Sequence, residues 1–444
     1  MSILVSWVAS VGLIIVALLL WLQGSPEAAT ALFAAIGILL MAVMGIWMAT
    51  PADKSWLPAV IALGYLAKLL ASVARFSVLK FIYDFSGDAT RYQGAGERYV
   101  QLWRSFESPP LDIGTKAVEA TTGFLYIPYV PTMLGGFLLF ATIAYLGQIL
   151  LYAAFRVSAK PESLKWYAAA MFFLPTIVYW PSSIGKESLM FVFIGLAAYG
   201  AAALLTNYRL RWAMVFGLGV IGTAAIRPHV ALLLVAALSF ALLLSKGASA
   251  RGMLGRKTLI ITVVVAFSLL VVVATTLKFG IDLAATGEVR SFLDTVEVRT
   301  GQGGSSVAGA AIRSPLDFPA GAIKVLFRPF PQEANNVQAL ASSAEGMLLL
   351  GILAWRFFPM LRNGRRIRRE PYLAFGFAFT IGFVIVFSAF NNLGILARQR
   401  SQVIPFLVAL IIAFGWKRAT GDEERSGRST AEHPAKGSAG LHPS

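Results

Sequence analysis

The feature that most constrains this chain is a succession of apolar segments, many of which approach or exceed the roughly 18 residues that indicate a membrane-spanning helix. Of the 444 residues, 57% are hydrophobic and 14% are charged, whereas a soluble protein carries about 25% charged residues. The mean hydropathy of +0.71 agrees with this pattern. We therefore expect an all-α fold, that of a polytopic helical integral membrane protein.

About twelve transmembrane helices are predicted. They cover residues 3–22, 28–49, 56–75, 132–155, 164–179, 186–205, 212–226, 230–244, 258–277, 345–361, 372–389 and 402–416. The first segment lacks a basic leader and a clear small-residue cleavage site, so we expect a retained helix rather than a signal peptide.

Basic connections predict the orientation, because cytoplasmic loops are enriched in Lys and Arg. The basic connections are 156–165, 207–211, 246–257 and 356–369. With twelve spans, all four fall on one side together with both termini, which we expect to be cytoplasmic. Two long loops, 76–131 and 278–344, then lie on the outer face. Residues 1–418 would form the transmembrane domain, and the polar residues 419–444 a disordered cytoplasmic tail.

The composition also excludes several kinds of site. The chain contains no cysteine, which excludes disulfides, thiol nucleophiles and thiolate metal sites. Of its three histidines, only His229 lies within the membrane domain, because His433 and His442 belong to the tail. A histidine-cluster metal site is therefore excluded, and we predict no cofactor, since a divalent metal has no support in the sequence. The net charge of +16 is divided between the two faces, so no nucleic-acid partner is expected.

A polar interruption at residues 180–187, Trp-Pro-Ser-Ser-Ile-Gly-Lys-Glu, separates two apolar runs. Polar groups placed against a membrane are costly and are often functional. One interpretation is a helix start, with Ser182 or Ser183 as the cap and Glu187 beside the positive end of the helix dipole. The other is an anion site, because a serine-rich helix N-terminus that carries Lys186 attracts negative groups.

Two carboxylates, Asp84 and Asp88, begin the first long loop four residues apart. They are interpreted either as a cap with a solvated charge or as a general base for a sugar hydroxyl. A divalent metal would need further oxygen ligands, so a metal site here has little support. Asp88 is the preferred base, because a helix that it N-caps would fix its position. This helix carries Tyr92, Tyr99 and Trp103 near one face and is expected to lie on the membrane surface.

Several arginines adjoin spans on the predicted outer side, where the positive-inside rule disfavours them. They are Arg91, Arg227, Arg328, Arg398 and Arg400. They are interpreted either as anchors at the lipid headgroups or, with Lys186, as ligands for phosphate, whose oxygens an arginine fork matches. His229 is a candidate acid or base.

Five short motifs resemble those of bacterial proteins of surface-polysaccharide synthesis. They are Asp-Ala-x-x-Tyr within 83–99, the segments 181–187 and 396–405, and the runs Arg227-Pro228-His229 and Arg328-Pro329-Phe330-Pro331. The chain is similar to O-antigen polymerases and O-antigen ligases, or more broadly to multi-span glycosyltransferases that use lipid-linked sugars. The resemblance implies residence in the bacterial inner (cytoplasmic) membrane, an undecaprenyl-diphosphate donor, and outer-face arginines that hold the diphosphate.

The chain departs from such enzymes in two respects. Their acidic base is typically in the first outer loop, whereas Asp84 and Asp88 lie in the second. A ligase-like histidine would have to be His229, the only histidine in the membrane domain.

Together with the charged residues above, this resemblance implies a glycosyltransferase or polymerase that moves glycan from a polyprenyl-diphosphate carrier to a saccharide acceptor. Asp88 or Asp84 would be the base, and Glu187 and His229 would orient the cations. The residues expected to bind diphosphate or glycan are Ser182, Ser183, Lys186, Arg91, Arg227, Arg328, Arg398 and Arg400. The expected partners are the lipid-linked glycan, a glycan acceptor, the bilayer and other polysaccharide-assembly proteins.

A transporter or flippase of lipid-linked glycans is the main alternative, because about twelve spans with both ends inside fit it equally well. Such proteins usually show an internal repeat with matched broken helices, and the sequence has no visible repeat. An intramembrane serine protease would need a serine paired with His229, and the chain contains no Gly-x-Ser-x-Gly motif.

Overall fold

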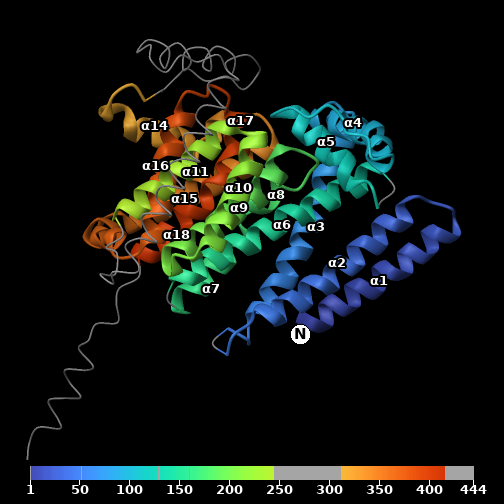
Figure 1. Ribbon diagram of the computed structural model, residues 1–444, viewed down its shortest axis with the longest axis horizontal. Helices are drawn as coiled ribbons and strands as arrows, with labels where there is room; N and C mark the ends of the chain where they lie inside the picture. The colour runs from blue at the N-terminus through green and yellow to red at the C-terminus, as the bar shows by residue number, and fades with distance from the viewer. Residues whose placement is uncertain (1, 52, 129–130, 160, 245–311, 416–444) are drawn as a thin grey trace, which may run out of the picture.

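The computed structural model describes residues 2–51, 53–128, 131–159, 161–244 and 312–415 (Figure 1). Within these ranges the regular elements are all helices and no strand occurs, which confirms the predicted all-α class. The predicted span 258–277, about half of the loop 278–344, and the tail 419–444 lie outside the described residues.

Among the described residues, seven helices are long and apolar enough to cross a membrane, as expected for a multi-pass membrane protein. They are α1 (Ser2–Leu22), α2 (Glu27–Met48), α3 (Leu57–Phe81), α6 (Met133–Ser158), α9 (Lys186–Asn207), α15 (Val337–Arg362) and α16 (Pro371–Ser388). An eighth candidate is bent by 57°, where α17 (Leu393–Gln399) and its 3₁₀ extension meet α18 (Ile404–Gly415). The remaining predicted spans within the described ranges are shorter helices: α7 (Pro161–Phe173) followed by α8 (Pro175–Tyr179), α10 (Leu210–Ile226) and α11 (Pro228–Leu244).

Helix α9 lies at the centre of the bundle. In its most apolar window 72% of the residues are buried, compared with 17% in α1, so α1 is peripheral. Helices α6 and α10 pack directly on α9. The α6–α9 contact requires glycine, because a β-carbon on Gly195 would lie 2.6 Å from the carbonyl oxygen of Gly147. Such close backbone contact favours helix association in lipid, where burial of apolar surface contributes little.

The helices that connect the spans gather at one end of the bundle. Figure 1 shows α4 (Asp88–Arg104), α5 (Thr115–Leu125), α14 (Phe318–Phe327) and α17 at the upper edge, while α7 and the N-terminus lie at the lower edge. Parts of both predicted outer loops therefore lie at the same end of the molecule.

Helix α4 differs in two ways from its prediction. Gly87, and not Asp88, is the N-cap, and a glycine has no side chain with which to cap the helix. The buried face of α4 packs against α5, a helix that the sequence analysis did not predict, rather than against the membrane alone. Gly96 contacts Thr122 and Gly123 contacts Tyr99, so the two helices approach closely from both sides.

Candidate functional site

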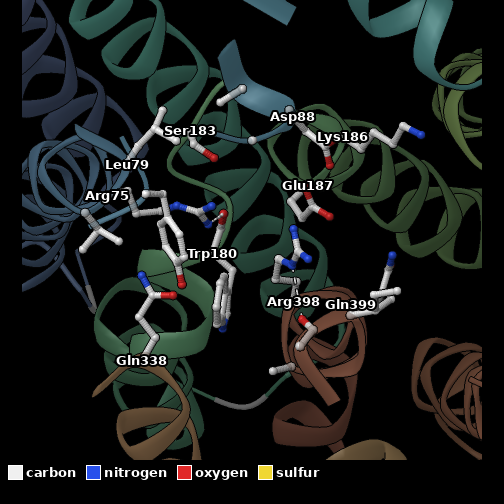
Figure 2. Close-up of a pocket in the computed structure, with 18 of the residues that line it drawn as sticks. Arg75, Leu79, Asp88, Trp180, Ser183, Lys186, Glu187, Gln338, Arg398 and Gln399 are labelled. Carbon is white, nitrogen blue, oxygen red and sulfur yellow. Dashed lines mark hydrogen bonds between the residues drawn. The ribbon is translucent and has the colours of Figure 1, made fainter. Parts of the chain in front are cut away.

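A cavity of ≈ 970 Å³ opens at the end of the bundle where α4, α5 and α17 lie (Figure 2). Its walls come from six parts of the chain that are far apart in sequence. These are residues 75–92, from the end of α3 to the start of α4; Phe137 of α6; residues 180–187; Arg227; residues 329–339, which lead into the start of α15; and residues 390–399, which include α17. The cavity exists only because the bundle brings these segments together.

One wall is the polar interruption at residues 180–187, and two prolines account for its shape. Pro175 and Pro181 lack an N–H group, so the carbonyl groups of Met171 and Ile177, four residues before them, lose their helical donors. The helix therefore breaks at Leu174, which has a ψ of 124°, and α8 is only 5 residues long. Beyond Tyr179 the chain is not helical until Lys186.

Side chains of neighbouring helices satisfy the backbone groups freed by this break. Gln148 of α6 donates to the Met171 carbonyl at 2.8 Å, and the fully buried Lys68 of α3 donates to the Ile177 carbonyl at 3.1 Å. Glu345 of α15 accepts from the Thr176 N–H at 2.6 Å. Irregular backbone at membrane depth requires such partners, because lipid supplies none.

The charged cluster, as we call Asp88, Lys186, Glu187, Arg227 and Arg398, lines the part of the cavity beside α9. Lys186 and Glu187 are the first two residues of α9, after the N-cap Gly185. Arg227 ends α10 and forms an ion pair of 2.9 Å with Glu187. Figure 2 shows Arg398, from α17, directed toward Glu187.

Arg227 has a donor without a partner. Its side chain is 10% exposed, and its Nη1 atom is buried and makes no hydrogen bond with any described residue. Leaving a charged donor unpaired in a buried position is costly, so a bound acceptor is the simplest complement to this atom. The Nη2 atom holds Glu187 in place at the same time.

Asp88 lies on the cavity wall in the first turn of α4, and Asp84 does not line the cavity. Asp84 is exposed in the turn after α3, where its φ of 44° is in the left-handed region. Tyr92, one turn after Asp88, also lines the cavity. Burial, together with the charges of Asp88 and Glu187, raises the pKa of Tyr92 to about 12, so its phenol stays a proton donor at neutral pH.

Of the remaining predicted binding residues, only Ser183 lines the cavity. Ser182 is fully buried and donates to the Val178 carbonyl, so neither serine caps α9. Arg328 forms an ion pair with Glu333, which does line the cavity, and the hydrogen bonds from Arg328 lower the pKa of Glu333.

Arg91, Arg400 and His229 also lie outside the cavity lining. Arg91 binds Glu119 of α5 at 3.0 Å and is largely exposed. Arg400 is fully buried and donates to the Ser342 carbonyl at 2.6 Å, which makes it a structural tie between η4 (Arg400–Gln402) and α15. His229 packs beside the ring of Phe387, with ring centroids 5.6 Å apart.

The cavity also contains residues that the sequence analysis missed. Arg75 was taken as the end of a span, but α3 continues to Phe81, so this arginine lies inside a membrane helix and lines the cavity. The apolar run that follows it was the available signal. No local pattern marked Tyr83 or Gln338 as lining residues.

No group of three potential metal ligands (His, Cys, Asp or Glu) occurs among the residues that the structure describes. No protein-family model, no curated protein and no solved structure matches this chain.

Proposed function

We propose that the chain is a membrane glycosyltransferase of surface-polysaccharide synthesis, which transfers glycan from a polyprenyl-diphosphate carrier to a saccharide acceptor. One observation carries this proposal. One cavity brings the carboxylate of Asp88 together with Lys186, Arg227 and Arg398, three of its four lining cations, and Arg227 has a buried donor with no partner among the described residues. Such a pocket suits a ligand that combines an anion with a reacting hydroxyl.

The step that this arrangement would catalyse is a displacement at the anomeric carbon of the donor sugar. The acceptor hydroxyl oxygen forms a bond to that carbon as the bond from the carbon to the phosphate oxygen breaks. The hydroxyl proton passes to Asp88, and the electron pair of the broken bond leaves with the diphosphate. Lys186, Arg227 and Arg398 would stabilise the charge that develops on the leaving group, which is often the largest contribution to catalysis.

In this proposal the chain sits in the bacterial cytoplasmic membrane, with about twelve spans and both termini in the cytoplasm. The cavity then opens to the extracytoplasmic face. Two observations support this orientation. The basic connection 156–165 adjoins α7 at the lower edge of the bundle, and the cavity elements lie at the upper edge.

The matched pair Asp88→Asn and Asp84→Asn tests the proposed base. With undecaprenyl-diphosphate-linked glycan as donor, purified wild-type protein should release free undecaprenyl diphosphate. We expect Asp88→Asn to lower this rate about 100-fold or more, the usual effect of losing a general base. Asp84→Asn should retain the wild-type rate, because Asp84 does not line the cavity.

Equal rates in the two variants would refute the assignment of the base. Wild-type protein could instead move the lipid-linked glycan across the bilayer of a vesicle without releasing undecaprenyl diphosphate. That result would refute the proposed transferase activity and identify translocation as the function.

A further inference from the structure

The cavity has a second part that is chemically different from the charged cluster. In Figure 2, Arg75, Trp180 and Gln338 lie to the left, away from Asp88, Lys186 and Arg398 on the right. We call the part around Arg75, Trp180 and Gln338 the amide–aromatic half. It also includes two further lining residues: Tyr83, which interacts electrostatically with Arg75, and Asn335, which precedes Gln338 by three residues.

The only cation of this half is already engaged. The Arg75 guanidinium lies 5.3 Å from the ring centroid of Tyr179 and 5.2 Å from that of Trp180. It also donates to the Trp180 carbonyl at 2.6 Å. Stacking on two rings and one hydrogen bond fix its plane, so its other N–H groups form a rigid set of donors.

The amides are held in place as well. Gln338 donates from Nε2 to the Tyr179 hydroxyl at 2.7 Å, which leaves its carbonyl oxygen as an acceptor. The side-chain oxygen Oδ1 of Asn335 accepts a hydrogen bond from the Asn336 side-chain amide at 2.9 Å, so the Asn335 side-chain NH₂ group remains a donor. Beside them Tyr83 is 43% exposed and offers an aromatic face.

From this arrangement we infer that the amide–aromatic half is a subsite for a neutral saccharide. A sugar presents hydroxyl groups that both donate and accept, together with an apolar C–H face. Fixed amides and a stacked arginine complement the hydroxyls, and Tyr83 complements the apolar face. This inference rests on the proposed function and identifies the part of the cavity that would hold glycan, while the charged cluster would hold the diphosphate.

The test separates the two ligands. The protein in nanodiscs is titrated with two probes: undecaprenyl diphosphate without sugar, and neutral oligosaccharides released by mild acid from the surface polysaccharide of the native host. Gln338→Ala and Tyr83→Ala should weaken oligosaccharide binding about tenfold each, the effect of losing one good contact. Both should bind undecaprenyl diphosphate within about twofold of wild type.

Arg398→Ala should weaken the binding of undecaprenyl diphosphate and leave oligosaccharide binding unchanged. Gln332→Ala is the matched control. Gln332 is exposed on the same segment as Asn335 but does not line the cavity, so its loss should change neither affinity. Melting temperatures would show that each variant folds.

The saccharide subsite is refuted if wild-type protein does not bind the oligosaccharides, or if folded Gln338→Ala and Tyr83→Ala both bind them as wild type does. Failure of the proposed function has a different signature. In that case undecaprenyl diphosphate would not bind, while oligosaccharide binding would still depend on Gln338 and Tyr83.

Discussion

At the scale of single residues, Arg227 decides how the charged cluster is organised. A planar guanidinium can hold Glu187 with one nitrogen and offer another to a ligand, as its unpaired Nη1 atom indicates. A lysine has one compact ammonium group and cannot keep this fork geometry. The charge alone is therefore insufficient at this position.

Arg227→Lys should lower the rate of undecaprenyl diphosphate release about 100-fold, comparable to the loss of one preorganised donor. The change retains the positive charge, so the protein should remain folded. Arg211→Lys is the control, because Arg211 is exposed near the opposite end of α10 and does not line the cavity. Equal rates in both variants would show that the fork of Arg227 is not used.

At the scale of elements, the broken helix α7–α8 shapes the cavity wall. Its prolines free backbone groups that α3, α6 and α15 satisfy through Lys68, Gln148 and Glu345. These buried polar side chains thus have a structural role. They stabilise the break in the helix that precedes residues 180–187.

Gln148→Leu should destabilise the protein by about 1 kcal/mol, the typical value of a hydrogen bond between membrane helices. The variant leaves the Met171 carbonyl buried without its donor. Unfolding in mixed detergent would measure the change, with Gln101→Leu on the exposed side of α4 as control. Identical stability of the two variants would contradict this role of Gln148.

The stability of the packing between α4 and α5 should depend on pH. Burial opposes ionisation of the Glu119 carboxyl, but its hydrogen bonds with Lys116 and Arg91 outweigh this and hold its pKa below the ordinary value of 4.5. Because the folded-state pKa is lowered, this stabilisation is complete above pH 4.5 and is lost as the pH falls through the folded-state pKa. At pH 6, a protease should cleave the 105–114 connection faster in Glu119→Gln than in wild type. At acidic pH the two cleavage rates should become equal.

At the scale of the whole molecule, the two ends of the bundle carry different chemistry. The cavity and the α4–α5 pair lie at one end, and α7 with the N-terminus lies at the other (Figure 1). The proposed orientation puts the cavity end on the extracytoplasmic face of the membrane.

Because the chain contains no cysteine, single substitutions can test this orientation. Ser105→Cys lies at the end of α4, and Ser55→Cys lies in the connection between α2 and α3; both serines are exposed. A membrane-impermeant maleimide should label Ser105→Cys in intact cells and Ser55→Cys only after the membrane is permeabilised. The reverse pattern would invert the orientation.

Length and hydrophobicity determined the apolar helices of this protein by themselves, because a long apolar segment has few alternatives in a membrane, whereas the short helix α5 was not predicted. Each predicted span within the described ranges coincides with one helix or with neighbouring helical pieces. The proline and the charges of residues 180–187 also predicted a polar interruption between two apolar helices. These are local properties, which a sequence carries directly.

Only the tertiary structure decided which of the marked residues share a cavity. Arg91, Arg328 and Arg398 carry the same charge, but the first two have carboxylate partners in α5 and η2 (Pro331–Glu333), while Arg398 lines the cavity. Asp84 and Asp88 are four residues apart, and a left-handed turn removes Asp84 from the wall. Partners and directions of this kind depend on segments distant in sequence, so the packing of the helices had to supply them.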